Sequence, residues 1–165
     1  MNLVHGDAPG IERDETEAER IDRNFNELLG ELRIALPGVQ VLFAFLLTVP
    51  FSHGFSGLSS FERYLYLAVL LLTALASALL IAPTAYHRML FRKGFKPEIL
   101  VFANRAAMAG LFVLALAMSG AILLITHVLF GAPAGIAVAA ASGIVFALLW
   151  YFLPYARGRR SQRDL

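Results

Sequence analysis

Residues 106–128 read AAMAGLFVLALAMSGAILLITHV, a run without Asp, Glu, Lys or Arg. The hydrocarbon core of a bilayer is about 30 Å thick and an α-helix rises about 1.5 Å per residue, so about 20 apolar residues cross it. The run shows no two-residue alternation, and a helix satisfies its own backbone hydrogen bonds in lipid. It therefore predicts a transmembrane helix.

Three more uncharged stretches of similar length occupy residues 34–51, 64–86 and 134–153. Of the 165 residues 58% are hydrophobic and 16% are charged, whereas a soluble domain is nearer to half apolar and a quarter charged. We therefore expect an all-α fold, an integral membrane four-helix bundle over residues 34–155. This composition excludes a soluble enzyme, and the absence of cysteine excludes a disulfide scaffold and a cysteine-ligated metal.

Basic residues are distributed unequally between the connections. The connection between the second and third spans and the basic tail, residues 156–165, hold most of the lysines and arginines outside the N-terminal part. These residues are Arg88, Arg92, Lys93, Lys96, Arg105, Arg157, Arg159, Arg160 and Arg163. The connections after the first and third spans carry only Arg63. Because basic residues tend to stay on the cytoplasmic side, the asymmetry predicts that both termini and the middle loop are cytoplasmic.

The N-terminal part of the chain is acidic, and residues 1–15 are expected to be a disordered tail. Residues 16–36 predict an amphipathic helix at the cytoplasmic face of the membrane, since Thr16 and Glu19 fit a capping box. An apolar stripe follows at helical spacing and consists of Ile21, Phe25, Leu28, Leu29, Leu32 and Leu36. We expect Pro37 to interrupt this helix where it enters the membrane, because proline has no N–H to donate.

Two uses of the stripe remain open. An acidic helix is repelled by anionic lipid, which favours docking on the basic loop and tail of the same chain. Alternatively, a partner protein or a second copy binds through Ile21, Phe25, Leu28 and Leu32. A further face for self-association is that of Gly135, Ala139 and Gly143 in the fourth span, although small residues at this spacing suit packing within one bundle equally well.

Five polar residues are candidates for binding a ligand. Gln40 is expected to face the bundle interior, because a side-chain amide needs partners outside its own helix. Asn104 and Arg105 begin the third span, where they would cap the helix or bind a phosphate head group. His53 and His127 fall in the two external connections and would approach each other as groups that titrate near neutral pH. Two imidazoles alone make a poor metal site, because zinc takes three or four ligands.

Motifs for other chemistry are missing. The sequence has no phosphate-binding loop, no H-E-x-x-H and no usable Ser/His/Asp set, and none of the four spans holds the carboxylate on which ion-coupled carriers rely. We therefore predict no catalytic residue, no metal and no cofactor. The net positive charge averages an acidic head and a basic remainder, so it does not indicate nucleic-acid binding.

Three stretches carry a resemblance to a known family. They read DRNFNELL at 22–29, GVQVLFAFLLTVPF at 38–51 and APTAYHRMLFR at 82–92. Over about residues 16–155 the chain resembles an uncharacterised actinobacterial family of small four-span membrane proteins, filed as a domain of unknown function. The resemblance implies a bacterial inner membrane, and some relatives carry an automatic sodium:proton antiporter label.

Two functions follow as hypotheses. The first is a non-enzymatic accessory or interaction protein that acts through its amphipathic head and its small-residue faces. The alternative is a small oligomeric transporter or channel, similar to a sodium:proton antiporter.

Overall fold

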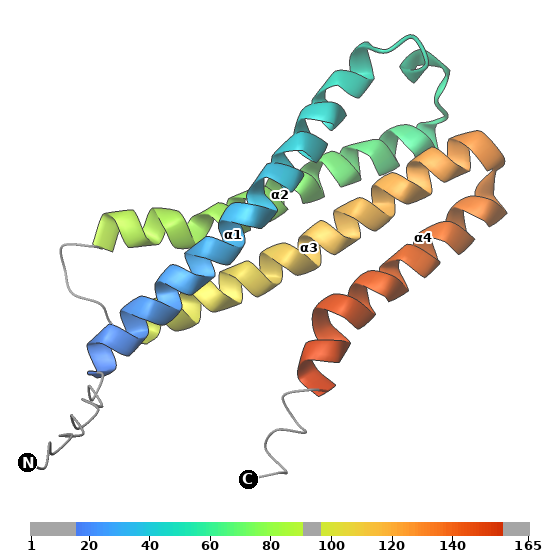
Figure 1. The fold of residues 1–165 in the computed structure, drawn as a ribbon. Coiled ribbons are helices and arrows are strands. Elements are labelled where there is room, and N and C mark those ends of the chain that lie inside the picture. Colours follow the sequence, from blue (N-terminus) through green and yellow to red (C-terminus); the bar gives the residue numbers. More distant parts are fainter. Residues whose placement is uncertain (1–15, 91–96, 157–165) are drawn as a thin grey trace, which may run out of the picture.

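The computed structural model describes residues 16–90 and 97–156, and within these ranges it contains helices and no strand. Figure 1 shows the four long helices, which are α1 (Glu17–Thr48), α2 (Ser60–Leu90), α3 (Pro97–Phe130) and α4 (Ala132–Ala147). Two short 3-10 helices, η1 (Val49–Phe51) and η2 (Phe55–Gly57), join α1 to α2, and a π-helix, η3 (Leu148–Phe152), extends α4. The all-α prediction is confirmed. The tail predicted at 1–15, and all but the first residue of the tail predicted at 156–165, lie outside the described residues.

Helices α1, α2 and α3, and the continuous stretch of α4 and η3 up to Ala156, are long and apolar enough to span a membrane, and each contains most or all of one predicted span. We call the end at which α1 and α3 begin and α2 ends the proximal end. The distal end is the opposite one, where residues 49–59 join α1 to α2 and Gly131 joins α3 to α4. Gly131 has φ +87°, a left-handed conformation that glycine adopts without strain and that suits a sharp reversal.

The antiparallel pair of α2 and α3 forms the centre of the molecule. A β-carbon at Gly110 would lie 2.8 Å from the Leu80 side chain, and one at Gly120 would lie 2.8 Å from that of Val69. Both positions therefore require glycine for the helices to approach this closely. Without a hydrophobic drive in lipid, such close approach is what holds membrane helices together.

Helix α1 runs unbroken from Glu17 to Thr48 with Pro37 inside it, so the predicted interruption is wrong. Pro37 removes only the N–H that would reach the carbonyl of Arg33, and its ring lies on the exposed face. On the opposite face Leu32 and Val39 are buried, at 4% and 1% exposure, on either side of the proline. This packing keeps the helix continuous through the defect, so the amphipathic head and the first span are one element.

The inward face of α1 repeats every seven residues through Phe25, Leu32, Val39 and Leu46, all of them buried. That spacing is typical of helices that pack side by side at a small crossing angle. Leu32 and Val39 belong to a core cluster with residues of α2 and α3. The apolar stripe of the head, with Ile21 and Phe25 buried and Leu28 half-buried, is thus covered within one chain. The basic residues at 91–96 and 157–165, the expected docking surface, lie outside the described residues.

The predicted capping box at the start of α1 is confirmed. The Thr16 N–H donates to Oε2 of Glu19 at 2.9 Å, and the Glu19 N–H donates to Oγ1 of Thr16 at 3.4 Å. Hydrogen bonds from the Thr16 backbone and hydroxyl favour the ionised carboxylate, and they hold the pKa of Glu19 below its ordinary value.

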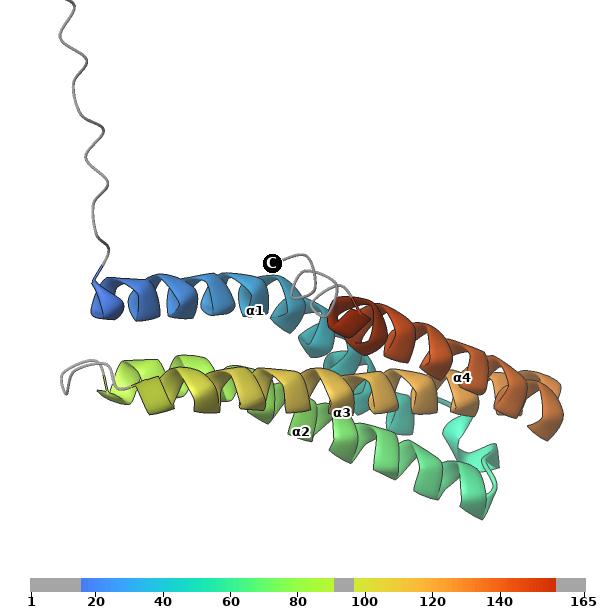
Figure 2. The ribbon, with the colours of Figure 1, turned by 90° about the horizontal axis from the view of Figure 1, so that it is seen from below.

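Helix α4 lies outside this three-helix core. It contacts α3 but neither α1 nor α2, and it runs along the distal half of α3 (Figure 2). Gly135 is buried where a β-carbon would lie 3.1 Å from the His127 backbone, and the same point at Gly143 would be 3.6 Å from Oγ of Ser119. The face of Gly135, Ala139 and Gly143 therefore packs against α3 within one chain. The rest of α4 is exposed and apolar.

Side chains near the proximal end of α4 show which residues share one level. The Tyr151 hydroxyl donates to the carbonyl of Met108 at 3.0 Å, and Trp150 lines a groove with Ile34. The Tyr151 bond therefore brings the predicted end of the fourth span level with the predicted start of the third. Residues 17–33 of α1 and 97–105 of α3 precede the predicted spans.

Candidate functional site

Polar side chains inside the helical core are few and already bonded. Thr73 is the one polar residue among the buried side chains of the described ranges, and its hydroxyl donates to the carbonyl of Val69 at 2.8 Å. Ser77 donates to the carbonyl of Thr73, and Ser142 to that of Val138. Because each hydroxyl donates to a carbonyl of its own helix, none of them needs a partner outside that helix.

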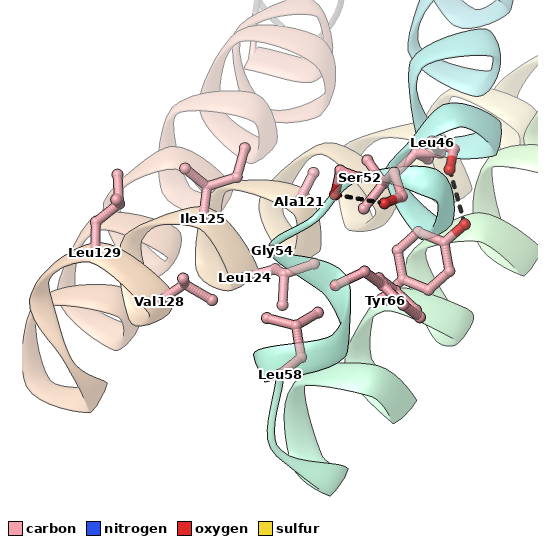
Figure 3. Close-up of a pocket in the computed structure, with 12 residues that line it drawn as sticks. Leu46, Ser52, Gly54, Leu58, Tyr66, Ala121, Leu124, Ile125, Val128 and Leu129 are labelled. Carbon is pink, nitrogen blue, oxygen red and sulfur yellow. Dashed lines mark hydrogen bonds between the residues drawn. The ribbon is translucent and has the colours of Figure 1, made fainter.

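Tyr66 joins α2 to the end of α1. Its hydroxyl donates to the carbonyl of Leu46 at 2.7 Å, the bond drawn in Figure 3. In a continuing helix that carbonyl would accept from residue 50, which is a proline without an N–H. Tyr66 thus supplies the donor that Pro50 lacks. Sequence analysis missed this role, although the spacing of Leu46 and Pro50 marks the orphaned carbonyl.

A pocket of about 300 Å³ opens beside Tyr66 at the distal end (Figure 3). Its walls come from the end of α1, the connection through Gly54 and Leu58, and the α3 residues Leu124 and Val128. Phe55 packs edge-on against the Tyr66 ring, with ring centres 5.2 Å apart. The walls are almost wholly apolar and the Tyr66 hydroxyl is engaged, so the pocket suits an apolar group.

The start of α2 meets the end of α3 through a contact between a carboxylate and an imidazole. Oε1 of Glu62 lies 3.7 Å from Nε2 of His127, and both side chains are largely covered. Oε2 of Glu62 accepts the Ser59 N–H at 2.7 Å, and Oγ of Ser59 accepts the Glu62 N–H at 3.3 Å. This is a second capping box, which the S-x-x-E spacing signals and sequence analysis overlooked. The Glu62 carboxylate therefore caps α2 and also contacts the His127 imidazole of α3. This arrangement is typical of a structural contact between two helices.

The two histidines have different surroundings. His127 pairs with Glu62 and packs edge-on against Phe61, with ring centres 5.5 Å apart, whereas His53 is exposed between η1 and η2. No group of three His, Cys, Asp or Glu side chains that could hold a metal ion occurs in residues 16–90 and 97–156.

The three other predicted residues are all exposed. Gln40 does not face the interior, because Val39 and Leu42 occupy the inward positions of that turn. Asn104 does not cap α3, since the helix begins at Pro97 and Asn104 lies two turns inside it. Asn104 instead lines a proximal groove of about 390 Å³ with polar residues of α1, among them Glu27 and Glu31. Arg105, its neighbour, is exposed.

A larger recess, which we call the lateral groove, lies at the depth of the predicted spans. It measures about 470 Å³ and is lined by α1 between Ile34 and Leu42, by α3 between Leu111 and Ile122, and by Trp150. The groove exists because α4 packs on α3 without reaching α1. Sequence analysis did not predict it, because hydropathy does not report which helices touch.

The π-helix shapes one wall of the lateral groove. The Leu153 N–H donates to the carbonyl of Leu148, five residues back, immediately before Pro154. Two neighbouring aromatic side chains in this wider turn have different contacts. Tyr151 donates a hydrogen bond to α3, and Trp150 lines the lateral groove. Such π-turns inside α-helices are frequently found at functional sites.

Comparison with known proteins identifies the family. The family described as "Family of unknown function (DUF6328)" matches residues 14–154, and the chain belongs to it. No curated protein and no solved structure matches the chain significantly.

Proposed function

We propose that this chain is a non-enzymatic accessory protein of the membrane, which binds a transmembrane helix of another membrane protein along the lateral groove. The observation that carries the proposal is the separation of α4 from α1, which leaves an apolar recess open at membrane depth. Gly38 and Ala35 on one wall are small, so the backbone of a partner helix can approach α1 closely. Trp150 and Met118 offer large, adaptable surfaces on the other side.

The core itself supports an interaction role over chemistry. Thr73, the buried polar residue of the described ranges, donates its hydroxyl proton to the Val69 carbonyl of its own helix. A transporter, the alternative function, needs a polar path or an ionisable group at membrane depth. Purified protein reconstituted in vesicles under a sodium or pH gradient tests this alternative, and flux above that of empty vesicles would favour it.

For location, we propose the plasma membrane of a bacterium with both termini in the cytoplasm. Arg33, Arg88 and Arg105 lie toward the proximal end, whereas Arg63 is at the distal end. The positive-inside rule then places the proximal end in the cytoplasm. Because the chain has no cysteine, a Ser56→Cys variant is a clean probe, and an impermeant maleimide added to intact cells should label it. An Asn26→Cys variant should be labelled only after lysis.

Filling the groove tests the accessory role. A β-carbon at Gly38 meets no atom within 4 Å, so Gly38→Phe places a ring in the groove without disturbing the core. Gly30→Phe is the matched control, since Gly30 is equally open on the same helix but does not line the groove. We expect Gly38→Phe to reduce recovery of a co-purified membrane protein about tenfold, with no change for Gly30→Phe. Identical co-purified proteins for both variants and the unaltered chain would contradict the proposal.

A further inference from the structure

One polar side chain at membrane depth has no partner. Gln40 is exposed, and its amide makes no hydrogen bond in the described part of the chain. It lies six residues after Ile34, where the predicted first span begins, so it sits about 9 Å inside the predicted boundary. The glutamine side chain is too short to return its amide to that boundary.

Leaving this amide in lipid is costly. Transfer of an unpaired amide from water to an apolar medium costs about 2–7 kcal/mol, depending on the reference state. The hydroxyls of Ser77 and Ser142 avoid this cost by bonding carbonyls of their own helices. A terminal amide, with two donors and one acceptor oxygen, needs groups from outside its helix. The position therefore indicates a protein surface next to α1.

The surroundings of Gln40 differ from an ordinary lipid-facing surface. Along one exposed face of α1, the residues at spacings of three and four are Pro37, Gln40, Ala44 and Leu47. The corresponding exposed face of α2 carries the large apolar side chains Leu67, Leu71 and Leu75. The α1 face is thus narrow and polar at its centre, which suits another helix better than acyl chains. Gln40 does not line the lateral groove, so this surface is separate from the proposed partner site.

We propose that a second copy of this chain covers the α1 face, in a side-by-side dimer whose two Gln40 amides bond each other. Two copies inserted the same way are related by a two-fold axis along the membrane normal, and this axis brings equal residues to equal depth. An amide is both donor and acceptor, so Gln40 complements itself across such an axis. The small residues on either side, Pro37 and Ala44, allow the two helices to approach closely.

Cysteine cross-linking in membranes tests the dimer, since the native chain has no cysteine. Leu47→Cys lies on the proposed face one heptad beyond Gln40, and Leu71→Cys is the control on the exposed face of α2. We expect a bifunctional maleimide to join two copies of Leu47→Cys and not of Leu71→Cys. Adding Gln40→Leu to Leu47→Cys should weaken dimerisation about tenfold, whereas Gln40→Asn, which retains the amide, should preserve most of it.

Three results would overturn the dimer. They are a Leu47→Cys chain that does not cross-link, a Leu71→Cys chain that cross-links equally well, and a Gln40→Leu variant as dimeric as the native chain. Because Gln40 is exposed, its replacement by leucine should leave the fold intact, which circular dichroism checks. The two single-cysteine chains retain Gln40, so they decide the matter even where the leucine variant fails to insert. The dimer and the accessory role are tested separately. A Gln40→Leu variant that no longer dimerises but still binds a partner in the lateral groove would support both proposals independently.

Discussion

The α2–α3 pair and helix α4 use similar small residues with different results. In the pair, Gly110 and Gly120 are pressed against Leu80 and Val69, and alanines along the interface are fully buried. In α4 only Gly135 makes a similarly close contact, with 3.1 Å in place of 2.8 Å, and beyond it the helix stays largely exposed. Small residues therefore permit close packing without enforcing it. Where packing stops short, the molecule retains a groove.

The largest expected effect separates these two regions directly. Gly110→Ala places a methyl group 2.8 Å from the fully buried Leu80, so we expect it to lower the free energy of unfolding by about 2 kcal/mol. Gly143→Ala, where the nearest atom is 3.6 Å away, should be neutral or stabilising by up to about 1 kcal/mol. Detergent-induced unfolding followed by circular dichroism measures both. Equal losses would mean that α4 is packed as tightly as the core.

A pair of tyrosines sharpens the same contrast. Tyr66→Phe leaves the Leu46 carbonyl without a donor, because residue 50 is proline, and should cost about 1.5 kcal/mol. Tyr151→Phe removes a bond to the Met108 carbonyl, which already accepts a helical N–H, so it should cost about 0.5 kcal/mol. The same unfolding assay applies. A larger loss for Tyr151→Phe would contradict the assignment of α2 to the core and α4 to the periphery.

A further effect is confined to α4. Gly135→Ala puts a β-carbon 3.1 Å from the backbone of His127, which cannot move aside as a side chain would. We expect faster amide hydrogen exchange in α4, by about fivefold for a local cost of about 1 kcal/mol, with exchange in α2 and α3 unchanged. Faster exchange throughout the chain would show instead that α4 unfolds together with the core.

Local features of the fold could be predicted from the sequence. The structure confirms that the four uncharged stretches lie in long apolar helices, and it confirms the capping box at Thr16 and Glu19. The membership of a family of unknown function is confirmed as well. Each depends on residues close together in the chain, or on a pattern that covers most of it. The predicted break at Pro37, by contrast, considered only the backbone of α1. The packing of Leu32 and Val39 against the other helices outweighs the missing hydrogen bond, and the helix continues.

The orientation of single side chains could not be predicted. A helix that is apolar on all sides gives no periodic signal for its inward face, so Gln40 was expected in the interior and lies outside. Likewise, the Tyr66 bond, the Glu62–His127 pair and the π-turn before Pro154 depend on which helices meet. Among the predicted site residues, only Asn104 and His127 gained polar neighbours, and those neighbours come from other helices.

The most direct test of the account uses its single tryptophan, Trp150, which lines the lateral groove. In vesicles without a partner, lipids with brominated acyl chains should enter the open groove and quench Trp150 fluorescence. Gly38→Phe should reduce that quenching and Gly30→Phe should not. Unquenched native protein, or equal quenching in both variants, would show that α4 closes onto α1 in a membrane and that no open groove exists.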